Sequence, residues 1–232
     1  MKEYPIFFND EMVRAILDGR KTQTRRPIKL PKKRDSFVLL DYGDGLWPYQ
    51  SDDGESPVCN DGNEHPYNSP YGYAGDRLWV RECFADDMGG AAKRLGDHLC
   101  YRADPLHPVF ADGGWTPSIH MPRWASRLTL ENTNVRVERL QDISEEDAIA
   151  EGLYSNEEYR SSAGDRRLFD CPVCHGDQVH EHIDMNGATE IDCNHCETAA
   201  KRFSLLWKSI YGQESLENNK WAWVYEFKRI EQ

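Results

Sequence analysis

The spacing of hydrophobic residues predicts a helix near the N-terminus that leads directly into an extended segment. The hydrophobic residues of this helix recur every three or four positions; they are Met12, Val13, Ile16 and Leu17. Asn9 or Asp10 can cap its start, and Gly19 is suited to end it. Residues 21–26 then favour an extended conformation, because Pro27 cannot continue a regular helix.

Alternation of polar and hydrophobic residues predicts strands further along the chain. Residues 77–82 alternate as a half-buried strand does. Residues 126–130 and 135–140 alternate as well, and the polar residues between them leave two interpretations open: two strands, or one long bulged strand. The segment 221–228 places an aromatic residue at every second position, so these side chains are expected to share one face. They are Trp221, Trp223, Tyr225 and Phe227.

Two further helices and two long loops complete the expected elements. Ser144 can cap a short helix with acidic residues in its first turn, and Gly152 can close it. Residues 198–211 carry hydrophobic residues at helical spacing, so this helix is expected to cover a sheet. Segments 31–76 and 85–120 are rich in turn-forming residues and are expected to be long ordered loops. The order of elements predicts a mixed α+β domain built on a curved sheet or small β-barrel.

Composition and charge narrow the classes of function. Charged residues make up 29% of the chain and the formal net charge is −12, which argues against a protein that coats long nucleic acid by bulk attraction. Nine cations and a single acid, Asp18, nevertheless lie between Arg14 and Arg34. This local basic face suits a small anionic ligand, such as a nucleotide phosphate or a short RNA segment. No segment has the apolar length of a signal peptide or a membrane span, so a cytoplasmic protein without membrane contact is expected.

The clearest chemical signal is a pair of C-x-x-C motifs separated by eighteen residues. The four cysteines are Cys171, Cys174, Cys193 and Cys196. This spacing is typical of a structural zinc site with four thiolate ligands, and replacement of one thiolate by His175 or His195 is the main alternative. The residues between the motifs can form a hairpin joined at Asn186-Gly187. Four protein ligands leave no open position for catalysis on the metal.

The zinc motifs are expected to form an insertion in the main domain. The main domain is predicted to comprise residues 1–165 and 198–232, and the zinc ribbon residues 166–197. Redox chemistry of the thioredoxin kind is disfavoured, because no βαβ pattern surrounds the motifs. The remaining cysteines match no motif and are expected to be free thiols; they are Cys59, Cys83 and Cys100.

The other candidate site is the segment 19–26, which follows the first helix and packs four cations around two threonines. The cations are Arg20, Lys21, Arg25 and Arg26. A lysine among like charges has its protonated form disfavoured, so its pKa tends to fall toward the range in which it can accept a proton. A nearby threonine hydroxyl could then be activated. A solvated basic turn without chemistry is the alternative interpretation.

Within this segment, four residues fit the G-x-K-x-x-[TE]-x-R signature of the ASCH domain; they are Gly19, Lys21, Thr24 and Arg26. Three further blocks resemble strands and an acidic helix of that family; they are residues 75–80, 135–151 and 225–228. The long form with a paired-cysteine insert is similar to ASCH proteins of phages and prophages. The resemblance implies a PUA-like small β-barrel that recognises RNA or modified nucleosides.

Some small ASCH proteins that resemble this chain are amidohydrolases, which remove the acetyl group from N4-acetylcytidine with a lysine, a threonine and a glutamate. By motif position these roles would go to Lys21, Thr24 and Glu151, with Glu82 as a competitor for the acidic role. Thr24 would attack the amide carbonyl, Lys21 would move its proton to the leaving amine, and Glu151 would orient the lysine. The long loops leave the identity of the substrate open.

Three functions therefore remain open at the level of sequence. The chain could be an amidohydrolase, a non-catalytic module that binds RNA or a modified nucleotide, or an adaptor whose zinc ribbon contacts a protein partner of a phage or its host. In the first two cases the ligand contacts are expected to come from basic residues and from tryptophans that stack on a base. These residues are Arg20, Arg25, Arg26, Trp79 and Trp124.

Overall fold

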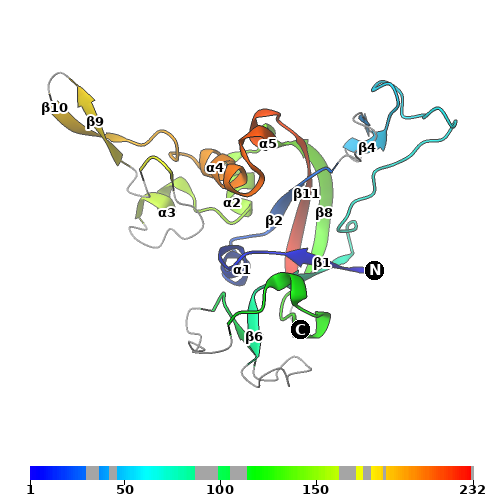
Figure 1. Cartoon of the computed structure of the whole chain (residues 1–232), viewed down its shortest axis with the longest axis horizontal. Coiled ribbons are helices and arrows are strands. Elements are labelled where there is room, and N and C mark those ends of the chain that lie inside the picture. Colours follow the sequence, from blue (N-terminus) through cyan, green and yellow to red (C-terminus); the bar gives the residue numbers. More distant parts are fainter. Residues whose placement is uncertain are drawn as a thin grey trace.

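A five-stranded sheet with the strand order β1-β5-β8-β11-β2 lies at the centre of the computed structural model (Figure 1). The structure describes residues 1–29, 37–41, 46–86, 99–104, 114–161, 171–174, 179–184 and 187–230. The central strands are β1 (Glu3–Phe7), β2 (Gln23–Pro27), β5 (Arg77–Arg81), β8 (Thr129–Arg139) and β11 (Trp221–Ile230). All neighbouring pairs are antiparallel except the parallel pair β1–β5. With the helices described below, this confirms the mixed α+β class.

Strand β8 is continuous and contains a bulge. Its register against β11 shifts between Glu226, which lies opposite Asn134, and Phe227, which lies opposite Asn132. Thr133 therefore has no residue opposite it in β11, which is the pattern of a β-bulge. Of the two interpretations of the sequence, the single long bulged strand is confirmed. In the described part of the chain, β1 and β2 are the two edges of the sheet, and the sheet does not close into a barrel.

One face of β11 carries its aromatic residues, as the alternation predicts. Trp223 and Tyr225 form a buried cluster with valines of β8, and Trp221 packs against that cluster. Phe227 extends the row into a second cluster, whose other members come mainly from β1, α1 and β5. Residues paired across β2 and β11 point to the same face of the sheet, so Thr24, opposite Tyr225, lies on this aromatic face.

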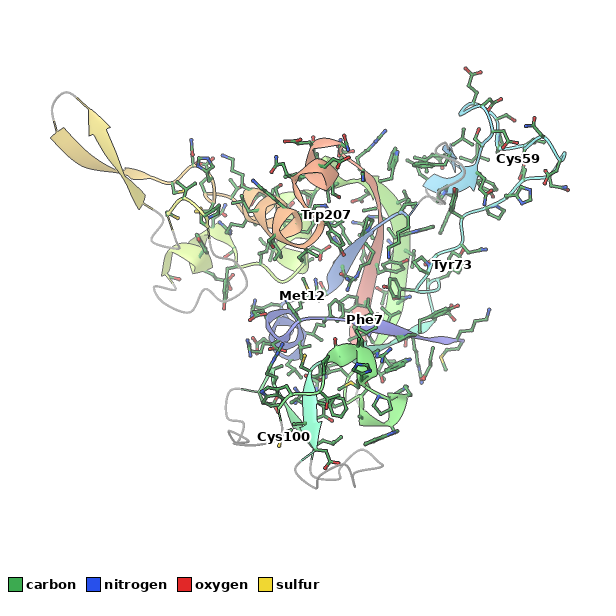
Figure 2. The ribbon with its side chains drawn as sticks, in the orientation of Figure 1. Phe7, Met12, Cys59, Tyr73, Cys100 and Trp207 are labelled. Carbon is green, nitrogen blue, oxygen red and sulfur yellow. The ribbon has the colours of Figure 1, made fainter. Side chains whose placement is uncertain are left out.

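The opposite face of the sheet lies under helices α2 (Glu145–Ala150) and α4 (Ala199–Tyr211). Phe203 and Trp207 of α4 are buried in a cluster that includes Ala222 of β11. Figure 2 labels Trp207, whose side chain lies between α4 and the strands. The apolar side of α4 thus covers the sheet, as expected from its helical spacing.

The helices begin and end at the residues that their sequence indicates. Asn9 caps α1 (Asp10–Leu17) by accepting a hydrogen bond from the Met12 N–H, and Ser144 caps α2 in the same way. Helix α1 connects β1 to β2, so it links the two edges of the sheet. The remaining helices are short: α3 (Asn156–Ser161), α5 (Gln213–Glu217) and the 3-10 helices η1 (Ser118–His120), η2 (Arg123–Ala125) and η3 (Leu140–Asp142).

Two segments that the sequence predicts as long loops contain paired strands. These strands are β3 (Phe37–Asp41), β4 (Leu46–Gln50), β6 (Phe84–Asp86) and β7 (Leu99–Tyr101). The loop prediction is wrong for them, because cross-strand pairs hold strands whose sequence does not alternate; Leu40 lies opposite Trp47, and Phe84 opposite Tyr101. The parts of these segments at 31–36, 42–45, 87–98 and 105–113 lie outside the described residues.

A hairpin of β9 (Val179–Asp184) and β10 (Gly187–Asp192) projects from one end of the molecule, between the two cysteine motifs (Figure 1). Gly187, which the sequence predicts as part of the turn, is the first residue of β10 and lies opposite Asp184. Asn186 itself lies outside the described residues. No helix in the described part of the chain is both long enough and apolar enough to cross a membrane.

Candidate functional site

The four cysteines of the two C-x-x-C motifs come together in one buried cluster. Their sulfur atoms all lie within 4.8 Å of one another, and each cysteine is at most 4% exposed. The Sγ atoms of Cys171 and Cys193 are 3.7 Å apart, and those of Cys174 and Cys196 are 3.5 Å apart. These separations are far longer than a disulfide bond of about 2.05 Å.

The cluster has the donor set and dimensions of a tetrahedral metal site. Thiolates at about 2.3 Å from a zinc ion in tetrahedral geometry lie about 3.8 Å from one another, close to both sulfur separations. Burial raises the pKa of the Cys171 thiol and of the Cys196 thiol, so adjacent thiolates here need a cation to offset their charge. The cluster could therefore hold a metal ion such as zinc. His195, which the sequence left as an alternative ligand, is exposed and lies outside the cluster, while His175 lies outside the described residues.

A buried arginine that the sequence analysis does not single out connects the cluster to α4 and to residue 154. Arg202 of α4 is 1% exposed and donates hydrogen bonds to the Cys196 carbonyl and the Tyr154 carbonyl, both at 2.8 Å. Its guanidinium also lies 4.3 Å from the ring centre of Tyr159. Helix α4 therefore anchors the second cysteine motif at its first turns and covers the sheet further along.

In the basic segment, the structure pairs Lys21 with Glu151. The Lys21 ammonium donates to the Glu151 carboxylate at 2.8 Å, to the Glu151 carbonyl at 2.7 Å and to the Gln23 carbonyl at 2.8 Å. Burial lowers the pKa of Lys21, while the Glu151 carboxylate acts in the opposite direction. Both side chains are almost completely buried. The three protons of the ammonium thus all have acceptors.

The other two residues considered for catalysis lie apart from these contacts. Thr24 is buried in β2, and its hydroxyl is not among the three acceptors of the Lys21 ammonium. Glu82 forms a two-pronged ion pair with Arg127 at 2.9 and 3.0 Å. Of the two carboxylates that competed for the acidic role, Glu151 is therefore the one that lies beside Lys21.

An ionic network that is buried at Arg25 and partly exposed at its other members lies beside this pair, on the face of the sheet under α2. Arg25 is inaccessible to solvent and donates to Glu138 at 2.8 Å and to Asp147 at 2.7 Å. Arg136 of β8 bonds Asp147 as well, and also pairs with Glu138 and Glu226. Arg25, which the sequence offered as a ligand contact, thus has its charge balanced inside the protein.

A cavity of about 310 Å³ opens on the aromatic face of the sheet, at the end of β2. It is lined by Arg26, Pro27, Ile28, Lys29, Tyr67, Asn68, Pro70, Tyr71, Tyr211 and Trp223. Strand β2 supplies Arg26, β11 supplies Trp223 and the end of α4 supplies Tyr211. Lys21, Thr24 and Glu151 are not among the lining residues, but Thr24 and Arg26 are two positions apart and so point to the same face of β2.

The other residues expected to bind a ligand lie away from this cavity. Arg20 donates to the Gly152 carbonyl at 2.8 Å and packs over the ring of Tyr154. The guanidinium groups of Arg81 and Arg123 lie 5.3 and 5.9 Å from the ring centre of Trp79. Trp124 packs against a small cluster around β6 and β7. Of the five residues that the sequence suggested, only Arg26 lines the cavity.

Sequence reasoning missed most of the cavity. The sequence predicts for Trp223 only that it shares a face with the other aromatic residues of 221–228, and it does not single out Tyr71 or Tyr211. The lining residues come from four separate segments of the chain, so no local sequence motif predicts them. The one available signal was the aromatic row of β11 next to a basic strand.

Comparison with protein-family models, with curated proteins and with solved structures found no match for this chain.

Proposed function

We propose that this protein recognises a nucleoside-containing ligand in the cavity between β2, β11, the end of α4 and residues 67–71. The main support for the proposal is the composition of the cavity lining, which contains four aromatic side chains and two cations. Flat aromatic rings stack on nucleobases, and cations attract the phosphate or polar edges of a nucleotide.

The dimensions and polarity of the cavity support this proposal. A volume of about 310 Å³ lies at the lower end of the range of ligand sites, which run from about 300 to 1,000 Å³. Apolar walls with a few polar groups are the usual construction of such sites. The polar groups here include the Asn68 amide and the Tyr211 phenol, which can bond base edges or ribose hydroxyls.

We also propose that the fold is of the ASCH type, which is a PUA-like β-barrel. In the described residues the sheet has two edges and does not close. Two features support the proposed fold. The basic signature lies where α1 enters β2, and α1 spans the two edge strands that a closed barrel would join. In addition, the Arg26 side chain of β2 donates to the Phe7 carbonyl of β1 at 2.7 Å, which bridges these edges.

Ligand binding is tested with the Tyr211→Ala variant. Loss of a stacking ring costs about 1–3 kcal/mol per base, so the affinity for the best of a panel of natural and N4-acetylated nucleosides should fall accordingly in calorimetric titrations. Ile210→Ala is the matched control, because Ile210 is the adjacent residue of α4, is 47% exposed and does not line the cavity. Equal affinities of the two variants, or no binding by any nucleoside of the panel to the unaltered protein, would contradict the proposal.

A second candidate function, hydrolysis of an N4-acyl group, is favoured by the buried Lys21–Glu151 pair. Burial lowers the pKa of Lys21, which helps a lysine to act as a base. In this proposal the Thr24 oxygen bonds to the acyl carbon and its proton passes to Lys21. Lys21 then protonates the leaving amine, and water releases the acid from the threonine ester. Lys21 enters this cycle as the neutral amine and returns to it, and Glu151 orients its nitrogen in both states.

The hydrolysis proposal is tested by acetate release from N4-acetylcytidine. Thr24→Val keeps the shape of the side chain but removes the hydroxyl, so it should abolish release, whereas Thr24→Ser should retain part of it. Circular dichroism and thermal melting verify that both variants fold. Release by Thr24→Val at the rate of the unaltered protein would exclude Thr24 as the nucleophile.

For the cysteine cluster, we propose zinc as the ion and a structural role as its function. Four thiolates complete a tetrahedral shell and leave no position for a substrate, which supports structure over catalysis. The same four-sulfur donor set is also characteristic of iron in Fe–S proteins, so metal analysis of the purified protein is the test. One equivalent of zinc per chain is expected, and iron in its place would overturn the assignment.

A further inference from the structure

We infer that the ligand of the cavity is a nucleoside monophosphate, whose phosphate is bound by Arg26 and Lys29. This inference rests on the proposed function, because it takes the aromatic walls as the base site and adds the group that the cations would bind. It also distinguishes among the ligands that the sequence left open, which were a nucleoside, a nucleotide and RNA.

The cations of the segment 19–26 differ in whether a carboxylate within the protein already neutralises their charge. Lys21 is paired with Glu151. Arg25 is paired with Glu138 and Asp147 and is fully buried. Arg26, the next residue of the same strand, has no carboxylate partner among the residues that the structure describes. Its charge is therefore the one in β2 that remains available to an anion.

The guanidinium of Arg26 is held in place and has donors to spare. It donates to the Phe7 carbonyl at 2.7 Å, while its contact with the Tyr211 hydroxyl, at 3.5 Å, is at the limit of a hydrogen bond. An arginine has five N–H donors, so most of them remain unused. The Nε atom is buried and has no hydrogen-bond partner within the described ranges. A positioned guanidinium with unused donors matches the geometry of a phosphate, which accepts two parallel bonds.

The charge of the lining residues also favours an anionic ligand. Arg26 and Lys29 are its two charged residues, and none of the described lining residues is acidic. This contrasts with the chain as a whole, which has 40 acidic residues against 28 lysines and arginines. Lys29 is exposed at the mouth of the cavity, where its flexible side chain can reach a phosphate whose base lies against the aromatic rings.

The size of the cavity favours a single nucleotide over a polymer. A volume of about 310 Å³ is small for a ligand site, whereas proteins that bind single strands use grooves that track several nucleotides. The net charge of −12 also disfavours a long polyanion, whose phosphates would meet the acidic body of the protein.

The test compares matched pairs of ligands by calorimetric titration of the full chain. The probes are the four ribonucleosides, their 5′-monophosphates, inorganic phosphate and a trinucleotide. The best monophosphate should bind at least about tenfold more tightly than its nucleoside, because its phosphate adds hydrogen bonds to charged groups; tenfold corresponds to about 1.4 kcal/mol. This advantage should grow from pH 5 to pH 7, as the phosphate loses its second proton near pH 6.

Two variants assign the effect to the named residues. Lys29→Gln alters an exposed side chain and should not unfold the protein, and Arg26→Gln removes the guanidinium. Each should lower the affinity for the monophosphate more than the affinity for the nucleoside, and so reduce the advantage of the monophosphate. Arg229→Gln, which removes an exposed cation at the far end of β11, is the control for net charge and should have no effect.

Each outcome bears on the inference separately from the proposed function. Equal affinities for nucleoside and monophosphate would overturn the inference but leave base recognition in place. An advantage that survives both Lys29→Gln and Arg26→Gln would also overturn it, as would a trinucleotide that binds much more tightly than every monophosphate. Binding of inorganic phosphate alone, with no affinity for any nucleoside or nucleotide, would overturn the proposed function and leave only an adventitious ion site.

Discussion

Arg25 and Arg26 are neighbours in the sequence but have opposite surroundings. Alternation along β2 sends Arg25 into the carboxylates under α2 and Arg26 toward the aromatic cavity. The sequence showed that this segment was a site of unusual composition. It could not show which cations were already balanced, because the partners Glu138, Asp147 and Glu151 come from more than 110 positions away.

The burial of Arg25 leads to a prediction about stability. Arg25→Met should lower the free energy of unfolding by about 1.5–3 kcal/mol, because Glu138 and Asp147 lose their charged hydrogen bonds to Arg25 but are partly exposed and keep Arg136 as a partner. The measurement is urea unfolding followed by circular dichroism. Lys228→Met is the control: Lys228 is exposed and pairs with Glu131 at 3.1 Å, and exposed pairs contribute about 0–1 kcal/mol. Equal losses of unfolding free energy in the two variants would show that the network around Arg25 contributes no more to stability than an exposed ion pair.

At the scale of elements, the end of α2 positions Glu151 against Lys21. Glu151 is the C-terminal cap of α2, and Gly152 follows with a φ of +100°. A Cβ on Gly152 would lie 3.0 Å from the Lys21 Cβ and 3.1 Å from the Ala15 Cβ. Only glycine satisfies both the backbone conformation and this close approach, so the turn fixes the distance between the helix and the basic segment.

Gly152→Ala should therefore lower the free energy of unfolding more than a glycine-to-alanine change at a position with open space around it. Gly19 is the matched control, because it also has positive φ, +76°, but a Cβ added to it would meet nothing within 4 Å. Backbone strain alone should lower the free energy of unfolding of Gly19→Ala by about 1 kcal/mol. Gly152→Ala should lose distinctly more, because neighbouring side chains must also move. Thermal and urea unfolding of both variants provide the comparison, and a loss at Gly152 no larger than that at Gly19 would refute it.

The elements were predictable where local signals determine them. Caps and helical spacing predicted α1, α2 and α4, and alternation predicted β5, β8 and β11. The pairs β3–β4 and β6–β7 were missed, because their stability comes from cross-strand contacts that a single segment does not reveal. The bulge in β8 could be offered only as one of two interpretations, since it depends on the register against β11.

At the scale of the whole molecule, the cysteine cluster fixes α4 to the insertion and α4 reaches the cavity at its other end. Arg202 bonds the second cysteine motif near the start of the helix, and Tyr211 lines the cavity as its last residue. The cysteine cluster was predictable from sequence, because the spacing of its motifs is local and chemically specific. The cavity was not, because it forms only when distant segments assemble.

Loss of the proposed zinc ion should thus destabilise α4 and the sheet that it covers as well as the cysteine motifs. Cys171→Ser should reduce the bound metal to well below one equivalent and lower the melting temperature, because the cluster belongs to the same buried core as Trp207. Metal analysis and thermal melting are the measurements. Cys83→Ser, at a half-buried cysteine outside the cluster, should leave the metal content unchanged. Unaltered metal content in Cys171→Ser would contradict the assignment of the ligands.

The most direct test of the central claim is a nuclear magnetic resonance titration that follows the tryptophan indole N–H signals. Trp223 lines the cavity, whereas Trp124 lies in a separate cluster. We predict that a nucleoside or nucleotide which binds will shift the Trp223 signal in a saturable way and leave the Trp124 signal in place. A Trp223 signal that stays unchanged across the full panel of nucleosides and monophosphates would contradict recognition in this cavity.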